Sequence, residues 1–355
     1  MDQMNLEKLA VIGIGLIGVR HAELIRAHPM ASLVGLCDVD PSRRAVADRF
    51  GVPFYTSVAE LLERERPAGV VIATSNATHA AVAEICAQRS VHLLIEKPIA
   101  STLEEARRIG EAAQAGGIRV LVGHHRRHNP LVQKTRELVR GGGLGRLTGV
   151  SLLWALLKPD AYFDVGWRRE RPGGGPVLIN LIHELDSLRF ICGEIEEVYA
   201  RSSSAVRGLA VEDSVSISLA FANGALGTIL ASDATPAAWS YEANTGENPV
   251  YFRTEENCVH FLGTAASLAF PRMELWRYAD ATRPGWTEPM ARSIVEVAGV
   301  DPLPLQLAHF CRVIRGEEAP VVDAEDATRS LAVALAVLES ARTGLPVHPV
   351  ALGGG

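Results

Sequence analysis

The first third of the chain alternates short apolar runs with stretches of helical spacing. The runs are LAVIGIG, ASLVGLCD, AGVVIAT, VHLLIEK and RVLVG, and stretches such as PSRRAVADRF and SVAELLERE lie between them. Strands that are apolar throughout are buried on both faces, and strands separated by helices pair in parallel. The pattern predicts a doubly wound parallel sheet, with helices on both faces, in residues 1–124.

The pattern changes in the second part of the chain, where polar and apolar residues alternate. Such runs are LTGVSLLWALL, EEVYARSSSAV, VSISLAFANGALGTILAS and CVHFLGTAASLAF. Alternation with a period of two is typical of an antiparallel sheet with one solvated face, and Asn223-Gly224 is a hairpin signal. We therefore predict a second α/β domain, residues 125–355, with a large, mainly antiparallel open sheet. Two helices are predicted to end it, residues 304–316 and 323–344, and the last can pack back on the first domain.

Charge and length exclude several classes of protein. A chain of 355 residues exceeds the usual size of one domain, which agrees with two domains. Its 35 lysines and arginines against 41 acidic residues give a net charge of −6, without a long basic run. Proteins that bind nucleic acids or membrane surfaces carry such runs, so we expect neither partner.

The cysteines and the amino terminus indicate the compartment. Five cysteines are scattered without a C-x-x-C pair, which disfavours a disulfide framework or a zinc ribbon and suits a reducing cytoplasm. The start, MDQMNLEKLAVIGIG, lacks the basic-then-apolar order of a signal peptide. No apolar run approaches the ~20 residues that span a bilayer. We expect a soluble cytoplasmic protein.

A glycine-rich turn follows the first predicted strand. The stretch VIGIGLIG places Gly13, Gly15 and Gly18 in G-x-G-x-x-G spacing, with Leu16 and Ile17 between them, just before a predicted helix. Such glycines allow a tight turn and close approach of the backbone to a pyrophosphate, which the helix amino terminus attracts. Taken alone this signal is weak, because any strand-to-helix turn can use glycines.

An acidic residue at the end of the second strand strengthens the signal for a dinucleotide site. Asp38 lies twenty residues after Gly18, where a carboxylate can accept hydrogen bonds from the adenosine ribose hydroxyls. The alternative, that Asp38 caps a helix, suits Asp40 better. Together these residues predict a Rossmann dinucleotide-binding domain. The carboxylate repels a 2′-phosphate and favours NAD, although Arg43 and Arg44 keep NADP possible.

Small polar residues end the next strand in the stretch VIATSNATHAA. Ligands lie at the carboxyl edge of such sheets, so Thr74, Ser75, Asn76 and, within the same stretch, His79 are candidate cofactor contacts. Asn76 or Thr78 can equally serve as a cap for the following helix.

The stretch LLIEKPIA places two charges directly after a buried strand. Glu96 and Lys97 stand where a charge is costly without a task or a partner, and Pro98 can form a cis peptide bond that directs the ammonium group. All three are candidate cofactor contacts, and Lys97 is a candidate catalytic group that stabilises a developing alkoxide. A lysine that reaches back to the surface is the alternative.

A histidine lies inside an apolar helix that follows three glycines, in GGGPVLINLIHELD. Helical periodicity places Asn180, His183, Glu184 and Ser187 on one polar side. Histidine titrates near neutrality and suits the proton transfer that accompanies hydride transfer, with Asn180 as a weaker catalytic candidate. Asp186, three residues further on, can orient the ring. A buried histidine with a structural partner is the alternative.

Two further stretches carry candidate substrate contacts. The first, GHHRRHNP, offers His124 and Arg127; its adjacent arginines would repel a cation, so no metal is expected. The second, KPDAYFDVGWRRERPGGG, offers Tyr162, Trp167 and Arg168 just before the histidine helix. Aromatic rings that stack on sugars and arginines that hold a carboxylate fit this pattern, and so does a loop packed under the sheet. If Arg168 or Arg169 faces the cleft, an acidic substrate such as a sugar acid or a carboxylated ring diol is favoured.

Taken in order, G-I-G-L-I-G, Asp38, TSNATH, EKP, GHHRRHNP and GGGPVLINLIHELD resemble the glucose-fructose oxidoreductase and inositol dehydrogenase (Gfo/Idh/MocA) family over nearly the whole chain. The resemblance implies NAD(P)-dependent oxidation or reduction of a sugar, cyclitol, sugar acid or cyclic diol. It implies that Lys97 contacts the reacting oxygen and that His183 is the acid or base. It also implies a homodimer or homotetramer formed through the open sheet. Many members carry an aspartate where this chain has Ile179.

Three other functions remain possible at this point. The protein can be a redox-assisted lyase or glycosidase that returns the hydride to its cofactor. It can be a regulator that binds NAD(P) without turnover, or a structural subunit.

Overall fold

The computed structural model describes residues 6–349, which fold into two compact units. The first unit holds the described part of Met1–His125 together with Leu303–Leu331. The second holds Arg126–Pro302 and the described part of Ala332–Gly355. The chain therefore passes between the units at three points.

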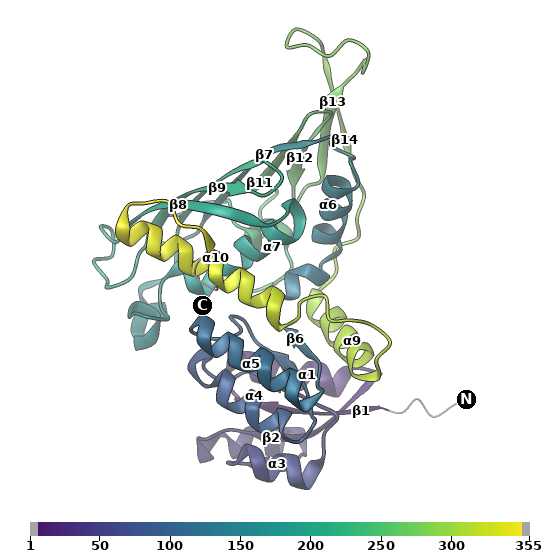
Figure 1. Cartoon of the computed structure of the whole chain (residues 1–355), viewed down its shortest axis with the longest axis vertical. Coiled ribbons are helices and arrows are strands. Elements are labelled where there is room, and N and C mark those ends of the chain that lie inside the picture. The colour runs from purple at the N-terminus through teal and green to yellow at the C-terminus, as the bar shows by residue number, and fades with distance from the viewer. Residues whose placement is uncertain (1–5, 350–355) are drawn as a thin grey trace. The chain divides into compact units, whose positions relative to one another are not determined.

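The first unit contains a parallel sheet of six strands in the order β3-β2-β1-β4-β5-β6. Strands β1, β2 and β6 of this sheet are labelled in Figure 1. Its strands are β1 (Glu7–Ile12), β2 (Ala31–Cys37), β3 (Phe54–Tyr55), β4 (Gly69–Ile72), β5 (His92–Ile95) and β6 (Val120–Val122). Its helices are α1 (Leu16–Ala27), α2 (Arg44–Phe50), α3 (Val58–Glu65), α4 (His79–Ala87), α5 (Leu103–Gly116) and α9 (Pro302–Arg315). The chain reverses its direction of build-up between β1 and β4, which creates the usual dinucleotide crevice of such sheets. The predicted doubly wound sheet is confirmed.

Helix α9 belongs to the first unit although it lies far along the chain. Its Leu307, Phe310 and Cys311 join the buried cluster formed by the first sheet. A Cβ at Gly69 on β4 would lie 2.8 Å from the ring of Phe310, so only glycine lets the helix pack this close. The core of the first unit is therefore built from two distant segments of the sequence.

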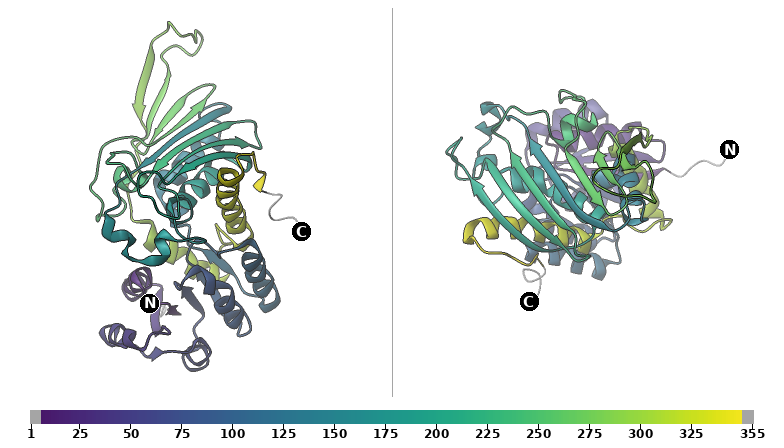
Figure 2. Two further views of the ribbon diagram at one scale, coloured as in Figure 1. Left: turned by 90° about the vertical axis from the view of Figure 1, so that its left-hand side faces the viewer. Right: turned by 90° about the horizontal axis from the view of Figure 1, so that it is seen from above.

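The second unit contains an eight-stranded sheet in the order β14-β13-β12-β11-β7-β10-β9-β8, seen as one broad surface in Figure 2. Its strands are β7 (Leu147–Ala155), β8 (Ile195–Ser203), β9 (Ser214–Phe221), β10 (Leu226–Ser232), β11 (Val259–Gly263), β12 (Ser267–Phe270), β13 (Glu274–Tyr278) and β14 (Met290–Ile294). Only β7 and β10 pair in parallel, so the predicted, mainly antiparallel open sheet is confirmed.

Helices α6 (Pro130–Arg140) and α7 (Ile182–Cys192) pack against each other in the second unit, and α8 (Tyr241–Thr245) is a short turn of helix. Helix α10 (Ala324–Thr343) begins in the first unit and ends in the second. The predicted hairpin is present, because Phe221 N donates to Ala225 O across Gly224, whose φ is +83°. Within residues 6–349, no helix combines the length and the apolar character needed to cross a bilayer.

Candidate functional site

The glycine turn links β1 to α1, and its three glycines have two different roles, close packing and leaving open space. Gly13 has φ +89°, and a Cβ there would lie 2.6 Å from the backbone of Ala73. A Cβ at Gly18 would lie 1.9 Å from the carbonyl oxygen of Gly13. At Gly15, in contrast, a Cβ would meet nothing within 4 Å. Gly13 and Gly18 are therefore required by packing, while Gly15 leaves open space in front of the helix.

The amino terminus of α1 faces this open space without a cap. Gly15 precedes the helix, so no side chain bonds to its first backbone N–H groups. Leu16 is 94% exposed and Ile17 is 38% exposed, although both are apolar. Uncapped N–H groups at a helix start attract an anion, and the exposed apolar groups offer contact surface beside it. This geometry fits the pyrophosphate of a dinucleotide.

Asp38 follows β2 and reaches back to the glycine turn. Its Oδ2 accepts a hydrogen bond from Ile14 N at 2.7 Å, and its Oδ1 accepts one from Asp40 N at 3.0 Å. The cap of the next turn is Asp40, whose Oδ1 accepts from Ser42 N at 2.9 Å. Asp38 therefore fixes the turn, and its remaining lone pairs can accept hydrogen bonds from ribose hydroxyls.

The stretch after β4 carries several of the predicted cofactor contacts, and among them the ring of His79 lies inside the protein. Thr74, Ser75 and Asn76 follow the strand, and Thr78 precedes α4 without capping it through its side chain. The ring of His79 is fully buried, with Nδ1 bonded to Ile99 O at 3.1 Å and Nε2 to Thr74 O at 3.2 Å. Cofactor contact by His79 therefore stays a prediction. The ring instead ties together the two backbone segments that follow β4 and β5.

Glu96 and Lys97 follow β5 and are held by a buried histidine that the sequence did not reveal. Nε2 of His21, on α1, donates to Glu96 Oε1 at 2.6 Å, and Lys97 N donates to Glu96 Oε2 at 3.3 Å. Burial raises the pKa of Glu96, but the hydrogen bond from His21 and the nearby Lys97 outweigh it and lower that pKa to about 2. The Lys97–Pro98 peptide bond is cis, as the sequence allows. Glu96 thus anchors the turn that carries Lys97.

The histidine helix of the second unit begins irregularly. Val177–Leu181 form a turn with π-helical hydrogen bonding, and the regular α7 starts at Ile182. His183 lies in its first turn and is 7% exposed. Turns of this kind are frequent at functional sites. Asn180, within the irregular turn, is partly exposed.

The predicted polar side of this helix is wrong beyond His183. Every residue of α7 is buried, including Glu184 and Ser187. Glu184 Oε1 accepts from Arg126 Nη1 at 2.5 Å, and Arg126 Nη2 binds Glu242 Oε1 at 2.9 Å. One guanidinium thus serves two carboxylates, and burial raises the pKa of Glu184. Glu184 belongs to an internal ion-pair network.

Arg127 and Asp186 form a second internal pair. Arg127 Nη2 donates to Asp186 Oδ1 at 2.6 Å and Nε donates to Oδ2 at 2.9 Å, and the guanidinium lies 4.9 Å from the ring centroid of Phe190. Arg127 is 3% exposed and has a structural role in this pair, and its substrate contact stays a prediction. An orienting contact of Asp186 with His183 stays a prediction. His124, the other candidate of that stretch, is buried.

Lys158 is a polar residue of the site that sequence reasoning missed. It is 6% exposed, and its Nζ donates to Asn180 Oδ1 at 2.7 Å and lies 3.2 Å from Asp233 Oδ2. Burial lowers its pKa, which the nearby Asp233 only partly offsets. The sequence did carry a signal for Lys158, because the pair Lys158-Pro159 follows β7 much as Lys97-Pro98 follows β5. The structure thus joins Asn180 to a buried ammonium group.

The loop between β7 and the histidine helix brings three predicted substrate residues together. Tyr162 lies in a short turn over Asp160–Asp164, and Trp167 and Arg168 lie in the next turn. The guanidinium carbon of Arg168 lies 4.1 Å from the ring centroid of Tyr162 and 5.8 Å from that of Trp167. All three side chains are at least partly exposed.

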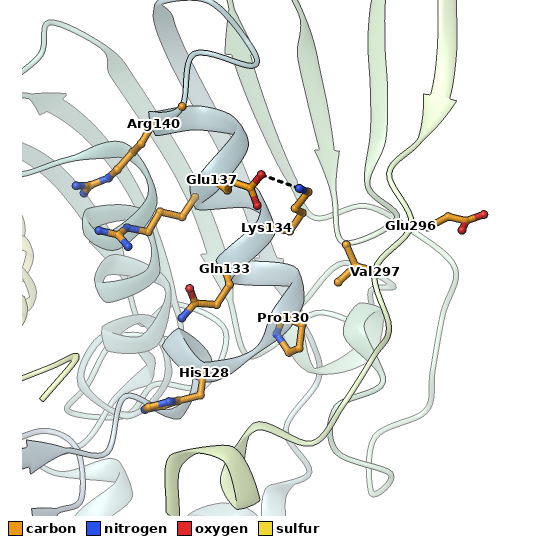
Figure 3. A pocket seen from close by; sticks show the side chains of 10 residues that line it. His128, Pro130, Gln133, Lys134, Glu137, Arg140, Glu296 and Val297 are labelled. Carbon is orange, nitrogen blue, oxygen red and sulfur yellow. Dashed lines mark hydrogen bonds and ion pairs between the residues drawn. The ribbon is translucent and has the colours of Figure 1, made fainter. Parts of the chain in front are cut away.

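An open groove of about 970 Å³ lies along α6 in the same unit (Figure 3). Charged side chains line much of it, and Lys134 Nζ binds Glu137 Oε1 at 2.8 Å within it. Arg140 is directed to backbone oxygens of Arg189 and Ile191. None of its lining residues is a candidate of the site, so we assign it no part in the chemistry.

Comparison with known proteins finds relatives of both units of the chain. Residues 8–124 match a family described as "Oxidoreductase family, NAD-binding Rossmann fold", and residues 132–269 match the "GFO/IDH/MocA C-terminal domain". Inositol 2-dehydrogenase of Rubrobacter xylanophilus is 31% identical over 346 residues, which cover 95% of this chain and 92% of that protein. The chain belongs to the Gfo/Idh/MocA family. It is therefore an oxidoreductase with an NAD-binding Rossmann domain.

Other relatives differ in their named substrates. D-apiose dehydrogenase of Paraburkholderia graminis is 27% identical, with 96% of this chain and 89% of that protein covered. 1,5-Anhydro-D-fructose reductase of Ensifer adhaerens is 31% identical, with 81% and 82% covered. The WlbA dehydrogenase of Bordetella pertussis, solved with NADH and UDP-GlcNAcA, shares the fold with a TM-score of 0.80 and 24% identity over 97% of this chain and 99% of that one. Family membership thus leaves the substrate open.

Proposed function

We propose that this protein is an NAD-dependent dehydrogenase that moves a hydride between the nicotinamide and a hydroxyl or ketone carbon of a polyhydroxylated substrate. The carbon belongs to a sugar, cyclitol, sugar acid or cyclic diol. One observation carries the proposal: the carboxyl ends of β1, β2 and β5 bring the open glycine turn, Asp38 and Lys97 to one edge of the sheet. The named activities of the relatives agree with this reaction class.

The first unit holds the cofactor in this proposal. The uncapped start of α1 receives the pyrophosphate, and Asp38 receives the adenosine ribose. A carboxylate at this point disfavours the 2′-phosphate of NADP by charge repulsion. Bound NAD supplies the hydride acceptor, while the residues of this chain bind the cofactor and handle the proton.

Lys97 and His183 divide the remaining chemistry. The ammonium of Lys97 stabilises negative charge on the reacting oxygen, and the His21–Glu96 pair fixes the turn from which it projects. His183 removes the hydroxyl proton during oxidation and returns it during reduction. Because Ile179 has no acidic group, proton transfer depends on the histidine alone in this segment.

The test is NADH formation with a panel of polyols, sugars, sugar acids and cyclic diols. We expect net NADH with at least one class, lost by about 10²-fold or more in His183→Ala. Product formation without net NADH would indicate a redox-assisted lyase or glycosidase. Cofactor binding without any product would indicate a regulator.

We further propose that the protein forms a homodimer or homotetramer through the exposed face of its large sheet. Leu226 on β10 and Leu262 on β11 are both paired with Gly149 on β7, so they lie in one row across three strands. Both leucines are exposed, as is Leu230, which lies four residues after Leu226 on the same face of β10. Light scattering after size exclusion tests this, and Leu226→Glu with Leu230→Glu should give monomers.

A further inference from the structure

Four side chains of the second unit form a cluster beside the histidine helix that offers mainly hydrogen-bond donors. They are Lys158, Tyr162, Arg168 and Asn180, which we call the donor cluster. The Lys158 ammonium lies 4.7 Å from the ring centroid of Tyr162, and the Arg168 guanidinium carbon lies 4.1 Å from the same centroid. Lys158 in turn binds Asn180, three residues before His183. The cluster therefore adjoins the proposed proton-transfer group.

Lys158 fixes which way the amide of Asn180 points. An ammonium group has only donors, so the atom of Asn180 that faces it at 2.7 Å must be the oxygen. The amide NH₂ group is then directed elsewhere, and within residues 6–349 no acceptor faces it. Asn180 is partly exposed. It therefore presents two N–H donors to a ligand, while its oxygen faces the Lys158 ammonium.

Arg168 has most of its donors available. Its Nη1 donates to Tyr162 O at 3.0 Å, and across the described part of the chain it has no other hydrogen bond and no acidic partner. The Tyr162 hydroxyl likewise has no hydrogen-bond partner among the described residues. A planar guanidinium stacked on an aromatic ring is held in the orientation that suits a carboxylate.

The charges of the cluster do not balance. Lys158 and Arg168 lie within about 9 Å of each other, since both lie close to the Tyr162 ring, and they repel at that range. The buried carboxylate that pairs with Lys158 is Asp233, and Asp233 also binds Arg207 Nε at 3.1 Å. Arg207 additionally reaches the fully exposed Asp160 at 3.4 Å. The cluster therefore keeps an excess of positive charge, which an anionic group would neutralise.

We propose that the donor cluster binds a carboxylate of the substrate, so that the substrate class is an acidic sugar or another carboxylated polyol. This inference rests on the proposed dehydrogenase function, because it concerns the substrate of the same site. The guanidinium of Arg168 and the amide of Asn180 donate to the carboxylate oxygens, while Lys158 supplies charge from behind Asn180. A neutral sugar offers hydroxyl groups that need acceptors as well as donors, and this cluster provides few acceptors.

The experiment compares D-glucose with D-glucuronate, and D-galactose with D-galacturonate, which differ by one carboxylate. Turnover is followed by NADH formation, and binding is followed independently by calorimetric titration of D-glucuronate into the NAD-loaded protein. The variant is Arg168→Gln. The matched control is Arg169→Gln, at the neighbouring exposed arginine, which makes no ring contact or ion pair in the described residues.

We expect the uronates to be preferred in both kcat/KM and Kd. Arg168→Gln should weaken uronate binding by about 10- to 100-fold, the usual range for loss of a charge-assisted hydrogen bond, and should lower the ratio of uronate to neutral-sugar kcat/KM accordingly. Arg168→Lys should retain part of the preference, and Arg169→Gln all of it. Equal binding of uronates and neutral sugars by the parent, or a preference that survives Arg168→Gln, would overturn the inference. If no substrate gives NADH, the proposed function fails, and the titration still decides whether the cluster binds a carboxylate.

Discussion

Replacing Glu96 with glutamine should remove an acid-sensitive part of the stability of the first unit. Glu96 is 9% exposed, and Nε2 of His21 donates to it at 2.6 Å. Glutamine keeps the shape and an acceptor oxygen but not the charge. The variant therefore separates the contribution of the ionised carboxylate from that of packing.

The magnitude follows from the pKa of Glu96, which falls from 4.5 to about 2 because the hydrogen bond from His21 and the nearby Lys97 outweigh burial. At about 1.4 kcal/mol for each pH unit, ionised Glu96 stabilises the folded state by about 3 kcal/mol at pH 7. The unfolded chain takes up a proton near pH 4.5, while the folded chain resists until about pH 2. The stabilisation is therefore complete above pH 5 and is lost as the pH falls, with about 1 kcal/mol left at pH 3.

The assay is hydrogen exchange followed by mass spectrometry, on peptides from β1, β4 and β5, at pH 7 and in acid. Tryptophan fluorescence would report the wrong unit, since all five tryptophans lie in the second: Trp154, Trp167, Trp239, Trp276 and Trp286. We expect Glu96→Gln to lower the free energy of opening of these peptides by about 3 kcal/mol at pH 7, and by much less at pH 3.

The control is Glu104→Gln on α5, where an exposed glutamate pairs with Arg107 at 2.6 Å on the surface of the same unit. Exposed pairs contribute little, so no measurable change is expected. If Glu96→Gln and the parent lose stability in parallel as the pH falls, the ionised His21–Glu96 contact does not stabilise the unit and the reasoning is refuted.

Three further outcomes are expected. The Gly15→Ala variant should fold normally but bind NAD with a higher Kd, because its Cβ enters the open space in front of α1. The Gly18→Ala variant should have a lower Tm, because its Cβ would lie 1.9 Å from Gly13 O. Equal effects of the two substitutions on folding would contradict this division. Arg127→Met should lower the free energy of unfolding by about 3–5 kcal/mol in urea denaturation, because it breaks the buried Arg127–Asp186 ion pair, and adding Asp186→Leu should restore part of the loss. A change in KM without a loss of stability would instead indicate that Arg127 contacts the substrate.

The sequence predicted most of the fold because the apolar runs of the first unit and the alternating runs of the second are regular. Strand β3 has two residues, and β14 is exposed at all five positions, so neither carries a hydrophobic pattern that a reader of the sequence can find. Fold prediction therefore failed where a strand was too short or too exposed to show a hydrophobic pattern.

Residues of the candidate site were predictable where they follow the end of a strand. They were less predictable where their partners are distant in the sequence. Lys97 and Asp38 stand directly after or near strand ends, and local reasoning found them. The partners of Glu96 and Arg127 are 75 and 59 residues away, so only the folded chain reveals them. The irregular turn Val177–Leu181 also escaped, because helical periodicity assumes a regular helix through His183.

Helix α9 also constrains when the protein can fold during synthesis. The buried cluster of the first unit needs Leu307, Phe310 and Cys311, which the ribosome makes after the whole sheet of the second unit. The nascent cofactor-binding unit must therefore remain incomplete while nearly two hundred further residues are translated, at about 5–20 residues per second. During that interval its parallel sheet lacks the cover of α9 and exposes apolar surface. We expect chaperones that recognise such surface to bind this chain during its translation.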